Sequence, residues 1–538
     1  MKYFILSILM VFMTHTRGFT QYISSITVPD TSIAKVTDPY DSSYRYASGI
    51  SPGTLRDHLK IIASDSLEGR ETGQKGIKIA SEYLQKNIRN LGLLPVPETK
   101  QYYQNVAFTF SKWKESNLYV DKERFQFLWD YIMITSNNQQ MPDIKASQVV
   151  FMGYGIDDNI YSDYKKNNVK DQIIMINKGE PSDKNGKSII TGKEELSEWS
   201  SDINRKLKVA KLKGVKLVLI IEDDIKKVSE NNRSELLSGN MELGNHLNKS
   251  INTANHIFIS STVAKAIIGK NEDKILKARE KYAKGKPESI TLKTDISINM
   301  SKEVSLLEGQ NVIGYIKGNT KPDEYVIVSA HYDHLGKRGD EIFNGANDNG
   351  SGTVTLLEMA QACQQAVMEG NPPQRSIVFL WVCGEEKGLL GSKYYSENPI
   401  FALEKTVANI NIDMVGRIDE KYRDNPDYIY IIGSDRLSTD LHKINESVNQ
   451  KYTQLTLDYT YNDTADPNRY YERSDHYNFA LKGIPAIFYF NGTHEDYHRT
   501  TDDIEKISFE AMANTGKLIF HTLWELANRN DRIVIDVK

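Results

Sequence analysis

From residue 311 onward, short apolar runs alternate with segments long enough to form helices. The runs are rich in β-branched residues and have the length of buried strands, and helix-length segments lie between several of them at 352–367 and 437–452. Such alternation predicts an α/β fold with a mostly parallel central sheet flanked by helices. Ligand sites in such sheets form at the carboxyl ends of the strands. The predicted strands are 312–316, 325–330, 376–382, 408–412, 428–432 and 486–490, and a last helix is predicted at 509–527.

The first half of the chain has a different pattern. Residues 21–50 are polar and without periodicity, which predicts a linker or an extended arm. Apolar residues at helical spacing then predict two helices between residues 54 and 91. In residues 111–300, strand-like pieces surround one predicted helix at 196–213, which indicates a separate, β-rich domain.

A short apolar run follows one basic residue at the start of the chain. Lys2 precedes the run 3–13, and this pattern is typical of a secretory signal peptide over residues 1–20. The alternative is an N-terminal helix that packs on the body of the protein. No later segment approaches the roughly 20 apolar residues of a membrane helix. We therefore expect an exported protein, periplasmic or secreted, without a stable membrane span.

The charge and the cysteine content of the chain exclude some classes of partner and of metal site. The chain has 67 Lys and Arg against 71 Asp and Glu, a formal charge of -4, so we expect no nucleic acid partner. Its two cysteines, Cys363 and Cys383, lie in apolar segments, and we expect two buried free thiols rather than a bridge. Without a Cys-x-x-Cys pair, a cysteine-based metal site is excluded.

Acidic residues and histidines follow several of the predicted strands. His331 and Asp333 come directly after the strand 325–330, and Asp413 ends the strand 408–412. Glu385 and Glu386 follow the strand 376–382, Asp348 lies in a glycine-bearing loop before a helix, and His498 follows the strand 486–490. Because the carboxyl ends of parallel strands meet at one edge of a sheet, we expect these side chains to converge.

Imidazole and carboxylate without thiolate form the ligand set of catalytic zinc. Two histidines and three carboxylates exceed the need of one tetrahedral ion and suit two metals about 3.5–4 Å apart with a bridging carboxylate. Glu385 and Glu386 are neighbours, and in extended backbone neighbouring side chains point to opposite sides. One can therefore ligate a metal while the other takes a proton from metal-bound water and passes it to a leaving amine.

These motifs resemble the M28-type dizinc metallopeptidases, a family that includes bacterial secreted aminopeptidases and, more distantly, glutamate carboxypeptidases and glutaminyl cyclases. The resemblance implies a zinc aminopeptidase-like domain split into residues 51–110 and 301–538. The matching strings are Ser329-Ala-His-Tyr-Asp-His-Leu-Gly336, Gly345-Ala-Asn-Asp-Asn-Gly-Ser-Gly352, Gly384-Glu-Glu386, Gly391-Ser392, Asn411-Ile-Asp-Met-Val415, Tyr497-His498 and, near the start, Ala63-Ser-Asp-Ser-Leu-Glu-Gly-Arg70 with Thr72-Gly73.

The block 111–300 resembles an inserted protease-associated domain in its segments 149–155, 161–164, 169–175 and 211–221. In that family the domain shapes or covers the access of substrate. These segments are mostly hydrophobic packing and turn glycines, so they are less specific than the catalytic motifs.

The family resemblance implies a role for each matching residue. His331 and Asp413 would bind one Zn2+, Glu386 and His498 the second, and Asp348 would bridge them. Glu385 would act as the general base, and Asp333 would fix the tautomer of His331. Tyr497 would hydrogen-bond the developing oxyanion, and Arg473 would contact substrate or form a structural salt bridge. His334, His476 and His494 receive no metal role.

The implied activity is hydrolysis of peptides, by an aminopeptidase. Two alternatives stay open: a glutaminyl cyclase-like aminoacyltransferase that binds a single zinc, and a carboxypeptidase on the same scaffold. The preferred side chain, the physiological metal and the oligomeric state do not follow from the sequence.

Overall fold

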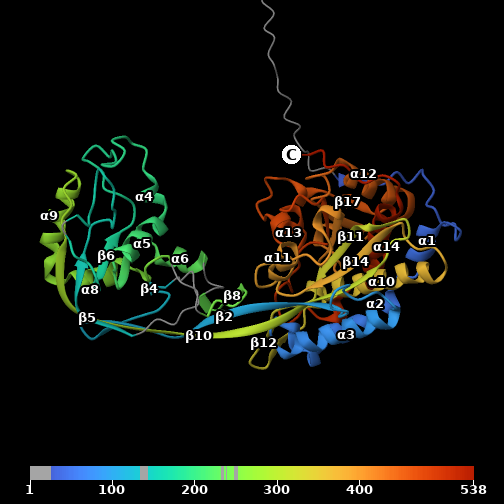
Figure 1. Ribbon diagram of the computed structural model, residues 1–538, viewed down its shortest axis with the longest axis horizontal. Coiled ribbons are helices and arrows are strands. Elements are labelled where there is room, and N and C mark those ends of the chain that lie inside the picture. Colours follow the sequence, from blue (N-terminus) through green and yellow to red (C-terminus); the bar gives the residue numbers. More distant parts are fainter. Residues whose placement is uncertain are drawn as a thin grey trace, which may run out of the picture. The chain divides into compact units, whose positions relative to one another are not determined.

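The computed structural model describes residues 26–133, 143–165, 167–231, 236–237, 239–247 and 252–537. The chain divides into two compact units (Figure 1): unit 1 comprises Met1–Gln104 with Gln310–Lys538, and unit 2 comprises Asn105–Gly309. The sequence suggested boundaries a few residues away, at 110 and 300. The predicted signal peptide, residues 1–20, lies outside the described residues.

The central sheet of unit 1 is mostly parallel. In order across the sheet, its strands are β1 (Ile26–Thr27), β17 (Thr456–Asp458), β16 (Tyr428–Ile432), β18 (Ala486–Phe490), β15 (Thr406–Ile412), β11 (Lys321–His331), β14 (Arg375–Val382) and the end of β10 (Ile290–Ile316). The neighbours β18, β15, β11 and β14 all run parallel. Antiparallel pairs join β10 to β14, β16 to β18 and β1 to β17. The predicted α/β fold is confirmed.

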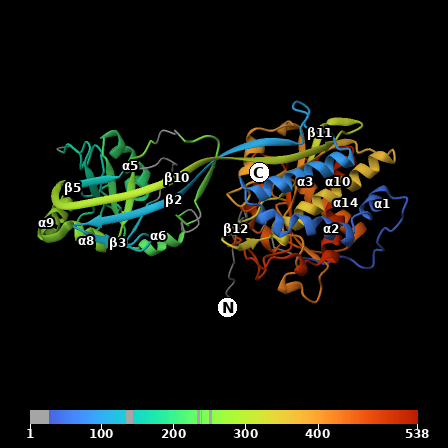
Figure 2. The same cartoon turned by 90° about the horizontal axis from the view of Figure 1, so that it is seen from below.

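Helices cover both faces of this sheet, so its central strands are largely buried. Every residue of β14, β15, β16 and β18 is buried. Helices α10 (Gly352–Met368) and α14 (Phe509–Asn528) pack together on one face, and α11 (Leu390–Glu397) and α13 (His476–Ala480) pack together on the other (Figures 1 and 2). Each buried Ile, Val or Leu contributes about 1.5–3 kcal/mol, and this two-sided core fixes the strand ends that carry the polar residues.

The N-terminal part of unit 1 is more ordered than the sequence suggested. Within residues 21–50, where we expected a linker or an extended arm, α1 (Ser42–Ala47) forms because Asp41 accepts a hydrogen bond from the Tyr44 amide. Its apolar side, Tyr46 and Ala47, is buried, and α1 packs against α14 and α10. The next elements are α2 (Pro52–Ile62), the 3-10 turn η1 (Asp65–Arg70) and α3 (Lys75–Leu91).

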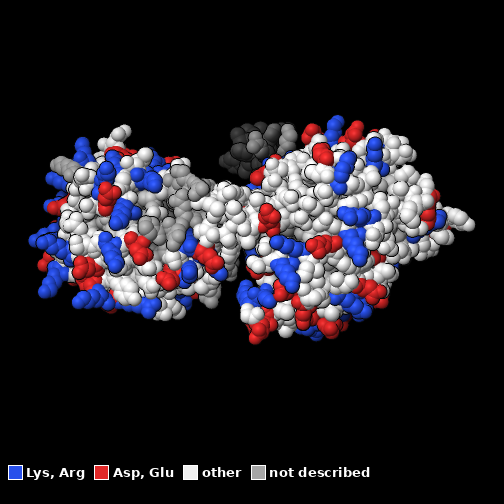
Figure 3. All heavy atoms as spheres, turned by 60° about the horizontal axis from the view of Figure 1, so that its bottom comes forward, with Lys and Arg blue, Asp and Glu red and all other residues white. Residues whose placement is uncertain are grey.

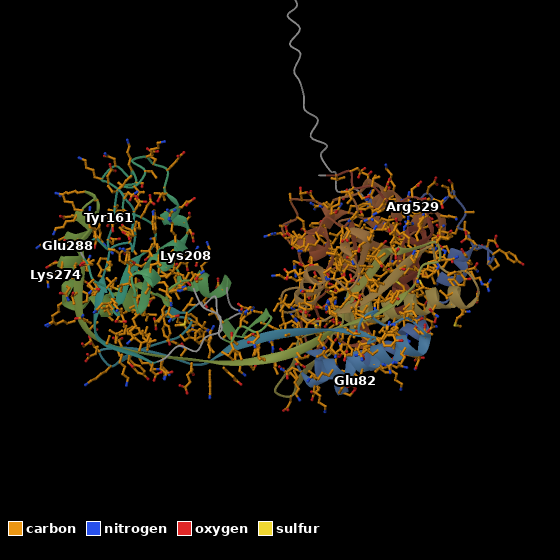
Figure 4. All side chains as sticks on the ribbon, in the orientation of Figure 1. Glu82, Tyr161, Lys208, Lys274, Glu288 and Arg529 are labelled. Carbon is orange, nitrogen blue, oxygen red and sulfur yellow. The ribbon has the colours of Figure 1, made fainter. Side chains whose placement is uncertain are left out.

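In unit 2, the strands β5 (Ile144–Phe151), β6 (Ile173–Asn177), β7 (Leu217–Ile221) and β9 (His256–Ile259) pair in this order, and each pair is parallel. The predicted helix at 196–213 corresponds to α5 (Ile203–Leu212). The sequence analysis missed α8 (Ser261–Ile268) and α9 (Glu272–Tyr282). Helix α9 is stabilised by burial of Ile275, Ala278 and Tyr282, while Lys274 is exposed on its outer side (Figure 4).

Two long strands and several short elements complete the described strands and α-helices. Strand β10 and strand β2 each contribute residues to both units, and in unit 1 the Ile313 amide donates to the Tyr102 carbonyl at 2.8 Å. The remaining strands and α-helices are β2 (Tyr103–Val120), β3 (Glu123–Phe125), β4 (Tyr131–Ile132), α4 (Glu198–Ser201), α6 (Ile225–Asn231), β8 (Asn240–Leu243), β12 (Gly336–Arg338), β13 (Glu341–Phe343) and α12 (Thr439–Val448).

The described surface mixes charges of both signs. On the faces visible in Figure 3, basic and acidic side chains are interspersed on each unit. Within the described ranges, every helix falls short of the length and apolar content that crossing a bilayer requires. Cys363 and Cys383 are both free and buried, as predicted.

Candidate metal centre

The carboxyl ends of adjacent strands bring the predicted ligands together. His331 is the last residue of β11, Glu385 and Glu386 follow β14, Asp413 follows β15, and His498 lies in the loop after β18. Strands β14, β11, β15 and β18 are consecutive and parallel in the sheet. Their ends therefore meet at one edge, as expected for a ligand site in an α/β sheet.

Asp348 reaches this edge from the turn η3 (Ala346–Ser351) that precedes α10. The amides of Asn347 and Asp348 both donate to the buried carboxylate of Asp502 at 3.1 Å. The Asn349 side chain donates to the Ile412 carbonyl at 2.8 Å, at the end of β15. These bonds hold the turn in place and orient the Asp348 carboxylate toward the strand ends.

Two sets of side-chain contacts share Asp348; they differ from the two groups of three closely spaced possible ligands among the described residues, which are His331 with Glu385 and Asp413, and His334 with Asp348 and Glu386. In the first set of contacts, His331 Nε2 lies 3.2 Å from Asp413 Oδ1 and 3.5 Å from Asp348 Oδ1. In the second set, His498 Nε2 lies 3.1 Å from Asp348 Oδ2 and 3.3 Å from Glu386 Oε2. Two ligands of one tetrahedral zinc at about 2.0–2.1 Å lie about 3.3 Å apart. The residues therefore fit two zinc ions in donor type and in spacing.

Glu385 and Asp333 border the first set of contacts. Glu385 Oε2 lies 3.9 Å from His331 Nε2, farther than the two carboxylates of that set. The nearest oxygen to His331 Nδ1 is the backbone carbonyl of Asp333, at 3.2 Å, with the Asp333 carboxylate at 3.8 Å. That carboxylate instead accepts from the Glu385 amide at 3.2 Å and from Thr72 Oγ1 at 3.0 Å.

The electrostatics of the cluster favour bound positive charge. Burial opposes a charge on both imidazoles, yet Asp413 and Glu385 raise the pKa of His331 well above its usual value. Asp348 and Glu386 likewise outweigh burial and raise the pKa of His498 to about 10. Burial is the main reason that the pKa of Glu385 is raised well above its usual value. The protein thus concentrates carboxylates where divalent cations would compensate them.

Two predicted substrate residues lie beside the second set of contacts. The Tyr497 ring stacks on the His498 ring, with the ring centroids 3.8 Å apart. Arg473 Nη2 lies 3.3 Å from Tyr497 Oη, and its guanidinium also lies over the Tyr470 ring. This pair of polar groups flanks the candidate metal centre.

Four residues in or near the site had not been assigned a role. Ser474 Oγ donates to Asp413 Oδ2 at 2.6 Å, and Thr72 and Arg70 contact the site from the N-terminal part of unit 1. His334, which received no metal role from the sequence, lies 2.8 Å from Glu386 and forms one of the two groups of possible ligands with Asp348 and Glu386, whereas His498 is in neither group. The other two histidines without a predicted metal role lie outside the metal-binding groups found among the described residues: His476 stacks on Phe488, and His494 contacts Asn347.

Known proteins share this domain. Residues 311–523 match the model of Peptidase family M28. Aminopeptidase YwaD of Bacillus subtilis (strain 168) is 30% identical over 253 residues, which are 46% of this chain and 50% of that protein. Leucine aminopeptidase 1 of Trichophyton rubrum is 30% identical over 225 residues, 40% of this chain and 58% of that protein. The chain thus spans about half the length of these relatives.

A solved structure shows the same fold. The structure "Aminopeptidase from Aneurinibacillus sp. strain AM-1" matches with a TM-score of 0.52 at 18% identity, over 92% of this chain and 98% of that chain. The sheet, its ligand-bearing edge and these likenesses together define a metallopeptidase domain. That domain, at residues 311–523, belongs to Peptidase family M28, a family of zinc-dependent hydrolases.

Proposed function

We propose that unit 1 is a two-zinc aminopeptidase that removes residues from the N-terminus of peptides. The observation that carries this proposal is the pair of contact sets that share Asp348 through different oxygens. His331 and Asp413 would hold one ion, and Glu386 and His498 the other. When bound, two zinc ions supply Lewis acidity toward the scissile carbonyl and make water easier to deprotonate.

Glu385 carries the proton transfer in this proposal. Its carboxylate lies beside the first set of contacts, and its amide donates to Asp333 at 3.2 Å, which fixes the backbone that presents it. A carboxylate in this position accepts the proton of the attacking water at Oε2 and delivers it to the amine of the leaving product.

Tyr497 and Asp333 orient the reacting groups. The Tyr497 hydroxyl is the donor for the negative charge that develops on the carbonyl oxygen, and Arg473 beside it strengthens that donor. The Asp333 backbone carbonyl accepts from His331 Nδ1, which leaves Nε2 free to bind a metal.

Blocked peptides test which end of the substrate is cleaved. We expect a peptide with an amidated C-terminus to be hydrolysed from its free N-terminus, and its N-acetylated counterpart with a free C-terminus to resist. Both peptides are incubated with the zinc-loaded protein and with chelator-treated protein, and products are identified by mass spectrometry. Cleavage of only the acetylated peptide would assign a carboxypeptidase. Conversion of N-terminal glutamine without any peptide hydrolysis would assign a cyclase.

The variant Glu385→Gln tests the proton transfer. Since Gln cannot accept the proton, we expect kcat to fall by about 10²–10⁴-fold, while zinc analysis still finds two ions per chain. Glu82→Gln, on the exposed side of α3 (Figure 4), is the matched control and keeps wild-type kcat. Full activity in Glu385→Gln would reject Glu385 as the base.

We further propose that unit 2 is a protease-associated-like domain and that the protein is exported. The first proposal is supported by the sequence segments named above, and the second by the apolar run behind Lys2. N-terminal sequencing of protein recovered outside the cytoplasm tests export. We expect a start near residue 20, and protein that keeps Met1 inside the cells would contradict it.

A further inference from the structure

Unit 2 carries a basic segment that the proposed peptidase function does not use. Residues 203–221, which comprise α5, a turn and β7, contain six basic and no acidic side chains. In the whole chain, by contrast, acidic residues slightly outnumber basic ones. Two of the six basic residues have partners inside unit 2, since Lys206 is buried and Arg205 lies 2.6 Å from Glu198. The other four are lysines in the second half of α5 and in the turn before β7.

The amphipathic pattern of α5 directs two of these lysines outward together with a leucine. Leu207 and Ala210 belong to the buried cluster that the helix shares with β6 and β7. Lys208, Lys211 and Leu212 follow i, i+3 and i+4 spacing and therefore lie together on the exposed face of the helix (Lys208 is labelled in Figure 4). The Leu212 side chain is 85% exposed.

The turn after α5 brings further lysines beside Leu212. The chain reverses at Gly214, whose φ is +72°, and Lys216 is exposed directly after the turn. A neighbouring loop lies against this turn, because the Asp171 amide donates to the Gly214 carbonyl at 2.8 Å. A Cβ atom on Gly214 would lie 3.2 Å from Cγ of the exposed Lys170. These side chains form one surface, the α5 patch, which consists of Lys170, Lys208, Lys211, Leu212 and Lys216.

Acidic residues neutralise this surface only in part. Asp157 lies 2.8 Å from Lys213 Nζ, and Asp171 is exposed next to Lys170. Within the described ranges, the four lysines of the α5 patch form no ion pair. Ile160, three residues after Asp157, is a second large apolar side chain in this region and is 67% exposed. The α5 patch therefore combines unpaired positive charge with exposed apolar surface.

Lysines around an exposed leucine suit the surface of an anionic bilayer. The leucine can enter the boundary between headgroups and acyl chains, while the long lysine side chains reach the lipid phosphates. Each lysine near such a surface strengthens binding about 5-fold. A soluble acidic polymer would attract the lysines but leave Leu212 in water. The combination of charge and apolar surface thus favours a lipid partner.

We infer that the α5 patch is a docking surface for anionic lipid bilayers and that Leu212 is the side chain that enters the lipid. The patch lies entirely in unit 2, and the inference does not depend on the candidate metal centre. It would place the peptidase at a membrane surface.

Vesicle sedimentation tests the role of the lysines. The protein is mixed with phosphatidylcholine vesicles, with and without phosphatidylglycerol, at low and at high salt. We expect tighter binding to the anionic vesicles, weakened by salt. The triple variant Lys208→Gln, Lys211→Gln, Lys216→Gln should lose about 5-fold in affinity per replaced lysine. The double variant Lys274→Gln, Lys277→Gln, on the exposed side of α9 (Figure 4), is the matched control and should bind like the wild type.

A tryptophan in place of Leu212 tests insertion directly. On addition of anionic vesicles, Leu212→Trp should show a blue shift of its fluorescence and quenching by brominated lipid, because the indole leaves water. Leu276→Trp, at an exposed leucine of α9, is the matched control and should show neither. Circular dichroism establishes that the variants fold, and hydrolysis of soluble peptides measures the proposed peptidase function separately.

The apolar run 3–13 is present in every variant, so the quantity compared is the preference for anionic over neutral vesicles. Equal binding of the wild type to both kinds of vesicle would overturn the inference, as would an unchanged preference in the triple variant. Unchanged fluorescence of Leu212→Trp on anionic vesicles would also overturn it. If polyglutamate binds with the same dependence on the three lysines and vesicles do not bind, the patch serves an acidic polypeptide and the lipid assignment is wrong.

Discussion

Tyr497 combines two contacts that a single substitution can separate. Its ring stacks on His498, with centroids 3.8 Å apart, and its hydroxyl lies 3.3 Å from Arg473 Nη2. The stacking supports a candidate metal ligand, while the hydroxyl is the proposed donor to the substrate. A phenylalanine at this position would keep the first contact and lose the second.

For Tyr497→Phe we therefore expect kcat to fall by about 10²–10³-fold, the usual loss when one oxyanion donor is removed, with an unchanged zinc content. Steady-state kinetics and metal analysis on the same sample measure both quantities. Tyr470→Phe is the matched control, because the Tyr470 hydroxyl contacts Thr493 at 3.5 Å instead. A loss of zinc in Tyr497→Phe would show that the hydroxyl serves the metal centre rather than substrate.

At the scale of residues, sequence reasoning named the side chains that the structure brings together at the sheet edge, because strand ends and residue types are visible in a sequence. It gave His331 a metal role and His334 none, although both occur in the same short string and both lie in the candidate site. Which ring faces Glu386 depends on the turn of the chain after Asp333 and on the space beside Gly345. Those contacts join residues far apart in the chain, and no local pattern encodes them.

The short segment 65–72, between helices α2 and α3, holds the loops of the candidate metal centre through hydrogen bonds. The Arg70 guanidinium is fully buried and donates to the carbonyls of Ile62, Tyr332, Asn344 and Gly345 at 2.6–2.9 Å. Two positions further on, Thr72 Oγ1 donates to Asp333 at 3.0 Å and accepts from the Gly384 amide at 2.9 Å. The loops after β11 and β14 are thus tied to an element that precedes both.

Thr72→Val removes the hydroxyl at nearly constant shape. Since the buried Asp333 carboxylate loses a donor and the Gly384 amide its acceptor, we expect a stability loss of about 1–3 kcal/mol per unsatisfied group. Loss of such an outer contact also lowers metal affinity or kcat/KM by about 10–100-fold. Thr72→Ser keeps the hydroxyl and should behave like wild type. If the Val variant matches the Ser variant in both measurements, the Thr72 hydroxyl has no part in positioning the site.

The predicted strands of unit 1 correspond to observed ones because their apolar runs are buried on both faces, and α10 and α14 were predicted within a few residues. In unit 2, α9 was missed because its exposed lysines mask the apolar spacing of Ile275, Ala278 and Tyr282. Helix α1 was missed because its six residues are too few to show a period, and its cap at Asp41 and its contact with α14 decide the structure.

In the whole molecule, several histidines away from the metal centre are buried in neutral form. Burial lowers the pKa of His521 to about 3 and that of His256 to about 4. His521 lies in α14, with Nδ1 2.7 Å from Ser43 Oγ and its ring stacked on Tyr452. The unfolded chain binds a proton at such a residue below about pH 6.5, whereas the folded chain does not until the pH approaches the lowered value. Stability contributed by these residues is therefore complete above pH 6.5 and is lost as the pH falls.

For His521→Asn we expect a weaker dependence of stability on acid. Asn stays neutral and can keep the hydrogen bond to Ser43, so the wild type should lose about 1.4 kcal/mol more per pH unit below 6.5. Urea unfolding of metal-free protein at pH 7 and pH 5 measures the difference, and His442→Asn, at a half-buried position, is the control. Identical pH slopes in wild type and His521→Asn would exclude this source of acid sensitivity.

The amide of Ile313 donates to the carbonyl of Tyr102, so the chain returns to unit 1 beside the point where it departs. Closing a long loop costs little more entropy than closing a short one. Because the two ends of the inserted segment are neighbours in unit 1, its insertion does not distort the strands of that unit. Unit 1 therefore places little constraint on the length of the segment inserted between these two points, and segments of other lengths could replace it during evolution. During synthesis, however, the ribosome makes Arg70 and Thr72 before unit 2, and their partners Tyr332, Asp333, Asn344 and Gly384 after it, so these contacts form only once unit 2 has been made.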